Sequence, residues 1–212
     1  MFSQAVHQID VVRRIVNRPV ESVFGRTGNW DSSRDTEGSF QALLNFEGGA
    51  FAVLCYSGYA HYDSDEQQNW ITELGSIKDR TDYGKSRKLL ATLARPEDEP
   101  RLKAERGFGE APMPEVPQYP EHFGPVIVSC DGADLRIYPH GVEVWADFER
   151  KFIPIDEFVS PRSPVFKGLY QAIRKGSPPV QSGRWGLDSL AICHAIMDSE
   201  KSRQVILTKE NN

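Results

Sequence analysis

An alternating segment followed by two glycines constrains the fold of this chain more than any other feature of its sequence. Apolar side chains occupy every second position, at Phe40, Ala42, Leu44 and Phe46. A period of two places these side chains on one face of a strand. Gly48 and Gly49 follow directly, and glycine permits the positive φ that a tight hairpin turn needs. The sequence therefore predicts a half-buried strand that continues through a hairpin into the next strand.

Short strand-like segments joined by turns make up most of the chain. We expect strands at 20–29, 38–47, 50–60, 68–75, 125–130, 133–138, 141–147, 151–155 and 204–207, and helices at 4–16, 85–93, 164–175 and 187–201. Strands that follow one another through hairpins pair antiparallel, and no strand–helix–strand alternation is visible. The predicted fold class is α+β, with one large, mostly antiparallel open sheet and helices packed on one face. A proline-rich section from about Lys78 to His122 is expected to be an insert.

Composition and charge narrow the class of protein. The 212 residues suffice for a single domain with its own core, which we take as residues 1–212. A net charge of -5 without a Lys/Arg-rich tract argues against a nucleic-acid partner. No apolar segment reaches the length of a membrane span, and the polar N-terminus is unlike a signal peptide. Three scattered cysteines (Cys55, Cys130 and Cys193) suggest buried thiols in a reducing compartment, so we expect a cytoplasmic protein.

A histidine and a carboxylate share one face of the first predicted helix. His7 and Asp10 are three residues apart, and Val6, Ile9 and Val12 recur at the spacing of a buried helix face. A carboxylate beside an imidazole can orient the ring, which then accepts or donates a proton. An acidic residue in the first helical turn also favours the helix dipole, so a structural role for Asp10 stays open.

This helix and the segments that follow it resemble the C-terminal domain of the Gfo/Idh/MocA oxidoreductases. The resemblance rests on the His-x-x-Asp helix, the strand at 19–28, the hairpin at 37–50, the Gly183-Arg184-Trp185-Gly186 motif with its helix, and the closing strand at 204–207. It covers most of residues 1–60 and 124–208. The tail and the Tyr56-Ser57-Gly58-Tyr59 segment look most similar to dehydrogenases of aromatic dihydrodiols, such as the phthalate 4,5-dihydrodiol type.

The resemblance implies an NAD(P)-dependent oxidoreductase that acts on a CH–OH group of a sugar, a cyclitol or an aromatic dihydrodiol. His7 and Asp10 would belong to its catalytic group, and Ser3 stands where many members carry Asp. The chain would be the substrate-binding and oligomerisation half, because the Rossmann domain and the lysine of its Glu-Lys-Pro motif have no counterpart here. NAD or NADP would bind the full-length protein and not this domain alone. The uncovered face of the sheet implies a homodimer or tetramer.

Several side chains are candidates for holding a small-molecule substrate. Arg13, Arg26 and Arg34 suit a carboxylated substrate, because a guanidinium binds a carboxylate through two parallel hydrogen bonds. Each of them taken alone is equally an ordinary surface arginine. Ser3 and Tyr56 are further candidates.

A polar cluster at residues 61–66 leaves other functions open. His61, Asp63 and Asp65 alternate along the chain and could hold a metal for hydrolysis or isomerisation. The simpler interpretation is a solvated loop, in which His61 borders the substrate pocket and no metal is bound. A stand-alone module that binds a small molecule without catalysis also remains open. Trp185 is expected to pack between the last helix and the sheet.

Overall fold

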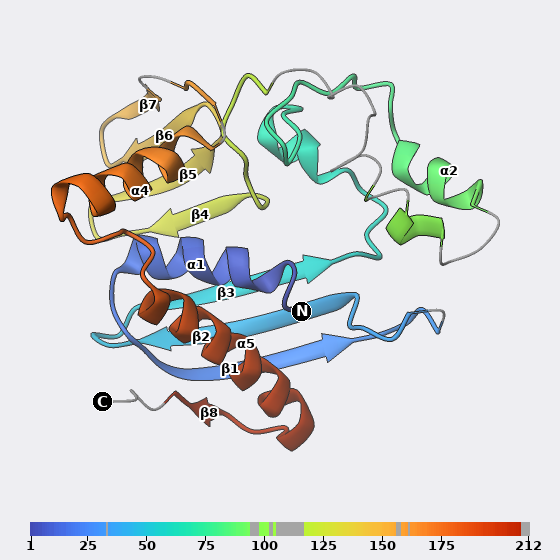
Figure 1. Cartoon of the computed structure of the whole chain (residues 1–212), viewed down its shortest axis with the longest axis horizontal. Helices are drawn as coiled ribbons and strands as arrows, with labels where there is room; N and C mark the ends of the chain where they lie inside the picture. The colour runs from blue at the N-terminus through green and yellow to red at the C-terminus, as the bar shows by residue number, and fades with distance from the viewer. Residues whose placement is uncertain are drawn as a thin grey trace. The chain divides into compact units, whose positions relative to one another are not determined.

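The chain folds into two compact units (Figure 1). The computed structural model describes residues 1–32, 34–93, 98–101, 104, 117–155, 158–160 and 162–208. The first unit comprises Met1–Ala60 and Gln171–Asn212, and the second comprises His61–Tyr170. The first unit therefore joins segments from both ends of the chain.

The first unit is built on a four-stranded antiparallel sheet. The strands β1 (Val20–Gly28), β2 (Ser39–Phe46), β3 (Phe51–Ser57) and β8 (Ile206–Leu207) lie in the order β3-β2-β1-β8. Gly48 and Gly49 adopt φ angles of +83° and +87° in the turn between β2 and β3. The predicted hairpin is therefore confirmed, together with the glycine geometry that its turn requires.

Two helices cover one face of this sheet. Helix α1 (Ala5–Val16) ends where Asn17 adopts the left-handed conformation, two residues before Pro19. Helix α5 (Gly183–Ser202) begins four residues earlier than expected, because the Ser182 side chain accepts a hydrogen bond from the backbone N–H of Trp185. Helix α5 packs closely on β1 at Gly25, where an added Cβ would lie 2.6 Å from Cγ2 of Ile196.

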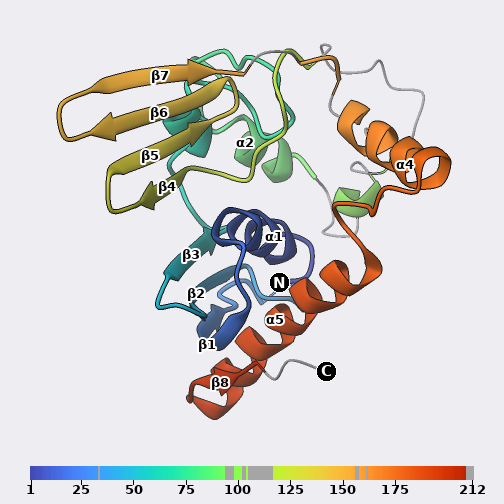
Figure 2. The same ribbon diagram turned by 90° about the vertical axis from the view of Figure 1, so that its left-hand side faces the viewer.

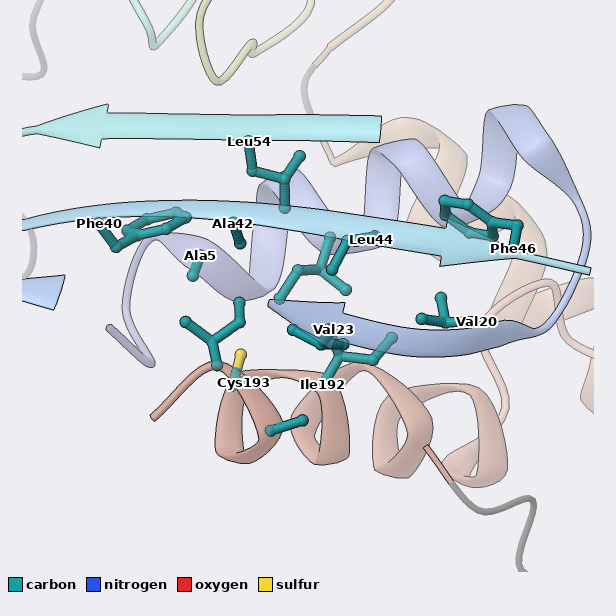
Figure 3. Packing of buried hydrophobic residues seen from close by; sticks show 13 residues of the cluster. Ala5, Val20, Val23, Phe40, Ala42, Leu44, Phe46, Leu54, Ile192 and Cys193 are labelled. Carbon is teal, nitrogen blue, oxygen red and sulfur yellow. The ribbon is translucent and has the colours of Figure 1, made fainter. Parts of the chain in front are cut away.

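The hydrophobic core of this unit lies between the sheet and the two helices (Figure 3). It comprises Ala5, Ile9, Val20, Val23, Phe40, Ala42, Leu44, Phe46, Leu54, Ile192, Cys193, Ala195 and Ile196. The alternating residues of β2 supply four of its members, as their period predicts. Burial in this core raises the pKa of the Cys193 thiol to about 11.

The second unit contains a four-stranded antiparallel meander (Figure 2). Its strands β4 (Val126–Ser129), β5 (Ala133–Tyr138), β6 (Gly141–Ala146) and β7 (Arg150–Pro154) pair in chain order. The 3-10 helix η1 (Ser64–Gln68) and the short helix α2 (Lys85–Ala91) precede them. Helix α4 (Ser163–Lys175) begins in this unit and ends in the first. Among the helices that the structure describes, none has the length and apolar character needed to cross a bilayer.

The α+β class with antiparallel open sheets is confirmed, but two of its details differ. The described strands form two sheets of four instead of one large sheet, because no described strand lies between β3 and β4 along the chain. Residues 68–75 form no strand, since Asn69 and Trp70 adopt positive φ angles that interrupt an extended backbone. The insert predicted from Lys78 to His122 lies partly outside the described residues, and its predicted helix is present as α2.

The cysteines also differ from expectation. Only Cys193 is buried, whereas Cys55 and Cys130 are exposed free thiols. Cys55 points away from the core because β3 alternates, with Leu54 on the buried face.

Candidate functional site

Helix α1 presents His7 on its outer side. The inner side is fixed by Ala5, Ile9 and Arg13, which are buried at four-residue spacing. His7 lies on the opposite side of the helix and is exposed, and Ser3 is exposed in the turn that precedes the helix. The packing of α1 therefore fixes which side of the helix faces solvent and carries the His7 imidazole.

Asp10 links α1 to the start of α5. Its carboxylate accepts a hydrogen bond from the indole Nε1 of Trp185 and another from Nε2 of Gln181, at 3.2 Å. Gln181, Trp185 and Asp10 thus join two helices whose sequences lie at opposite ends of the chain. The orientation of His7 by Asp10 stays a prediction. The two hydrogen bonds fix the position of the Asp10 carboxylate.

Arg13 is engaged in the same junction. Its guanidinium lies 4.0 Å from the centroid of the Trp185 ring and donates to the Trp185 carbonyl at 2.7 Å. It also donates to Ser189 Oγ at 2.6 Å and to Asp188 Oδ2 at 3.2 Å. Burial lowers the pKa of Arg13, and the charges of Asp188 and Asp10 act against this shift. Only 8% of Arg13 is exposed, so we assign it to the helix junction rather than to a substrate carboxylate.

The partner of Trp185 differs from the sequence prediction. Trp185 contacts Asp10 and Arg13 on α1, rather than packing between α5 and the sheet. The signal for this junction was present in the sequence as spacing. Asp10 and Arg13 are three residues apart on one helix, and Trp185 and Ser189 are four apart on the other. Spacing alone did not show that the two pairs meet.

Arg26 and Arg34 remain exposed but are held by carboxylates. Nε of Arg26 lies 2.8 Å from Oε2 of Glu200 on α5. Glu200 also accepts the backbone N–H of Thr27 at 3.0 Å. Nε of Arg34 lies 3.1 Å from Oδ2 of Asp31 in the loop after β1. A substrate carboxylate would have to share or displace these partners.

Tyr56 lies at the margin of the core in the same unit as His7. Its ring stacks on Phe40, with 5.9 Å between the centroids and 23° between the ring planes. Tyr56 packs against the hydrophobic core that Met1 and Val6 also border. The structure therefore places Tyr56 and the first turn of α1 against one core, on the helix-covered side of the sheet.

The polar cluster at residues 61–66 belongs to the second unit and is organised by a lysine. Nζ of Lys78 lies 2.5 Å from Oδ2 of Asp63 and 3.0 Å from Oδ2 of Asp65. Partial burial works to lower the pKa of Lys78, but the hydrogen bonds and charges of the two carboxylates outweigh it and raise the pKa. The backbone carbonyl of exposed His61 accepts a hydrogen bond from the Tyr83 hydroxyl.

The Lys78 ammonium occupies the position at which a metal would have to meet both carboxylates. Among the residues that the structure describes, no group of three or more His, Cys, Asp or Glu side chains is placed to hold a metal ion. The geometry of Asp63 and Asp65 is that of a charge-paired loop, which disfavours the metal-assisted hydrolase or isomerase.

Comparisons of sequence and fold find similarity to dehydrogenases over almost the whole chain. The chain is 35% identical over 205 residues to 1-carboxy-3-chloro-3,4-dihydroxycyclo hexa-1,5-diene dehydrogenase of Comamonas testosteroni, covering 95% of this chain and 52% of that enzyme. A crystal structure from Bordetella bronchiseptica RB50, assigned as a dehydrogenase, matches with a TM-score of 0.85 and 35% identity. That match covers 96% of this chain and 53% of the other. The chain thus spans about half the length of the curated relative it matches.

A family model matches the N-terminal part of the chain. Residues 1–78 match the GFO/IDH/MocA C-terminal domain. These matches confirm the resemblance to the Gfo/Idh/MocA C-terminal domain that was drawn from the His7 helix and the strand pattern. An oxidoreductase from Agrobacterium radiobacter, solved with NAD+, L-tartaric acid and magnesium, shares the fold at 14% identity and a TM-score of 0.57, over 95% of this chain and 47% of that one.

Proposed function

We propose that this chain is the substrate-binding half of an NAD(P)-dependent dehydrogenase that oxidises a CH–OH group of a cyclic dihydrodiol. The observation that carries this proposal is the 35% identity to the Comamonas testosteroni enzyme, which extends over 95% of the chain. The name of that relative describes a cyclohexadiene with a carboxyl group and two hydroxyl groups. We therefore favour a carboxylated dihydrodiol over a sugar or a cyclitol as the substrate class.

His7 is the proton carrier in this proposal. The bound nicotinamide supplies the hydride acceptor, and the substrate hydroxyl must lose its proton as hydride leaves the same carbon. An exposed imidazole on a helix held by Ala5, Ile9 and Arg13 suits this task, because a general base must reach the hydroxyl within hydrogen-bond distance. Asp10 acts through His7. The hydrogen bonds from Trp185 and Gln181 to the Asp10 carboxylate hold α1, and with it His7, in place.

The substrate would be held by groups around α1 and by exposed arginines. Ser3 precedes His7 by about one turn, and Tyr56 borders the same core. Arg26 and Arg34 keep their exposed guanidiniums as candidates for the carboxylate of the substrate. His61 remains a candidate from the loop that begins the second unit.

The nicotinamide cofactor would bind outside this chain. A dinucleotide site needs a strand, a glycine-rich turn and a helix in direct succession. The strands that the structure describes in this chain are instead connected mainly by hairpins. We expect calorimetric titration of this chain with NADH or NADPH to give no heat of binding, and micromolar binding would contradict this assignment.

Replacing His7 tests the proposal. In a full-length enzyme that contains this domain, His7→Ala should lower kcat about 10²–10⁴-fold, the usual effect of losing a positioned acid or base. His194→Ala is the matched control, since His194 is also exposed on a helix of this unit and contacts the Phe2 ring. The control should retain its turnover. Similar kcat values for His7→Ala and the wild type, with equal melting temperatures, would remove the proton carrier from this domain.

We further propose that the domain self-associates, as a dimer or tetramer, through the sheet face that α1 and α5 leave uncovered. Phe24, Leu43 and Val53 lie opposite one another across three strands on that face, and Phe24 and Val53 are exposed. Apolar side chains aligned across neighbouring strands favour contact with a second surface. Sedimentation of the wild type and of Val53→Asp checks this: association should weaken in the variant, and a wild type that stays monomeric at high concentration would refute it.

A further inference from the structure

Helix α4 carries an apolar face that is open to solvent. Val165, Phe166, Leu169 and Tyr170 are 57%, 68%, 56% and 54% exposed. Their spacing of one, three and four residues places all four on one side of the helix. No residue of α4 is buried. These four residues, the α4 apolar face, lie within the second unit.

The charges of α4 are all of one sign. Lys167, Arg174 and Lys175 are its only charged residues, and none of them interrupts the apolar face. A helix of 13 residues is marginally stable in water unless its apolar side packs on something. An exposed face with two aromatic rings and a basic border is therefore suited to a partner surface that is apolar at its centre and acidic at its rim.

The length of the relatives points to a partner for the α4 apolar face. This chain matches 52% of the Comamonas testosteroni enzyme and 53% of the Bordetella bronchiseptica protein. Nearly half of each relative therefore lies outside the matched region. A dehydrogenase whose cofactor and proton carrier sit in different halves needs a firm contact between them, because hydride transfer requires the reacting atoms to be held in near-attack geometry.

We propose that the α4 apolar face is a docking surface for the cofactor-binding half of the parent enzyme. This proposal rests on the proposed function, since it takes its partner from there. Phe166 and Leu169 occupy the centre of the face and would be buried on docking. Lys167 would meet carboxylates at the rim of the partner surface.

The test uses this full chain and one defined probe. The probe is the part of the Comamonas testosteroni dehydrogenase that this chain does not match, produced as a separate polypeptide. We expect a complex in calorimetry, with amide hydrogen exchange of residues 163–170 slowed at least about tenfold on binding. Phe166→Asp combined with Leu169→Asp should weaken the complex at least about tenfold. Val159→Asp, at an equally exposed apolar residue outside α4, should leave it unchanged.

A second variant separates this proposal from the proposed function. His7→Ala should bind the probe as tightly as the wild type does, whatever its effect on catalysis. The docking proposal is overturned if no complex forms at micromolar concentrations, or if the complex forms without protection of residues 163–170. It is equally overturned if those residues become protected in the chain alone, at rising chain concentration, or on vesicles that contain phosphatidylserine.

Discussion

The two sheets share strand number, hairpin connections and antiparallel pairing, yet among the described residues only the first sheet borders a hydrophobic core. In the first unit, Leu44 and Val23 are fully buried beneath α1 and α5. In the second unit, Leu135 and Val144 lie on interior strands with the same alternation but are only half-buried. Among the described hydrophobic residues of β4–β7, none is fully buried.

This difference separates two steps of folding. Alternation and turn residues suffice to form strands and to pair neighbouring ones, since both are local properties of the chain. Burial of a sheet face needs a helix or another surface, which the first unit obtains from segments at opposite ends of the chain. The second unit therefore depends more on its hydrogen-bond ladder and less on apolar burial.

The sharpest test of this contrast is a matched pair of leucine truncations. Leu44→Ala on β2 removes a fully buried side chain and should lower the free energy of unfolding by about 2–5 kcal/mol. Leu135→Ala on β5, also an interior strand, should cost only about 1 kcal/mol, because its side chain is half-buried. Urea unfolding of both variants measures the two values. Equal losses would show that the second sheet is covered after all.

A second pair compares a buried arginine with an exposed one. Arg13→Ala removes the donors for the Trp185 carbonyl, Ser189 and Asp188, and we expect a loss of about 1–3 kcal/mol. Arg150→Ala removes an exposed ion pair with Glu143 on the second sheet and should cost less than about 1 kcal/mol. Thermal melting of the two variants ranks their losses of stability. A larger loss for Arg150→Ala would show that the Arg13 junction is not the more stabilising of the two contacts.

The order and ends of most elements could be predicted because they depend on local pattern. The β2–β3 hairpin and the end of α4 at Gly176, with a φ of +67°, follow from residues that allow few alternatives. The segment at 68–75 could not be predicted this way. Its apolar residues resemble a strand, but Asp63 caps a 3-10 turn and Asn69 ends it in the left-handed conformation.

The candidate site was predictable only in part, because its contacts are distant in sequence. The exposure of His7 follows from the period of α1, and the structure agrees. The burial of Arg13 does not follow, since its partner Trp185 lies 172 residues further along the chain. An arginine on a helix is equally suited to a substrate carboxylate and to a helix junction, and only the fold distinguishes them.

The smallest expected effect concerns Glu200, which ties α5 to strand β1 of the first sheet. The backbone N–H of Thr27 donates to its carboxylate, and the guanidinium of Arg26 adds a charged hydrogen bond. These contacts, the Thr27 hydrogen bond above all, lower the pKa of Glu200 in the folded chain despite some desolvation. On the second sheet, the Arg136 guanidinium of β5 donates to the Gln67 carbonyl of η1. That link involves no carboxyl group, so the pKa effect belongs to the covered unit.

The pH dependence of Glu200→Gln has a definite sign. A carboxyl group whose pKa is lowered on folding contributes stability that is fully present above its unfolded pKa of about 4.3, and that is lost as the pH falls through the lower folded value. At pH 7 the free energy of unfolding of the wild type should therefore exceed that of Glu200→Gln by less than about 1 kcal/mol, because Arg26 is largely exposed. This gap between the two free energies should close in acid. Arg26→Met should keep part of the dependence, since the Thr27 contact remains. A gap that widens toward low pH in urea titrations would contradict the lowered pKa, and with it the role of Glu200 in holding α5 on the sheet.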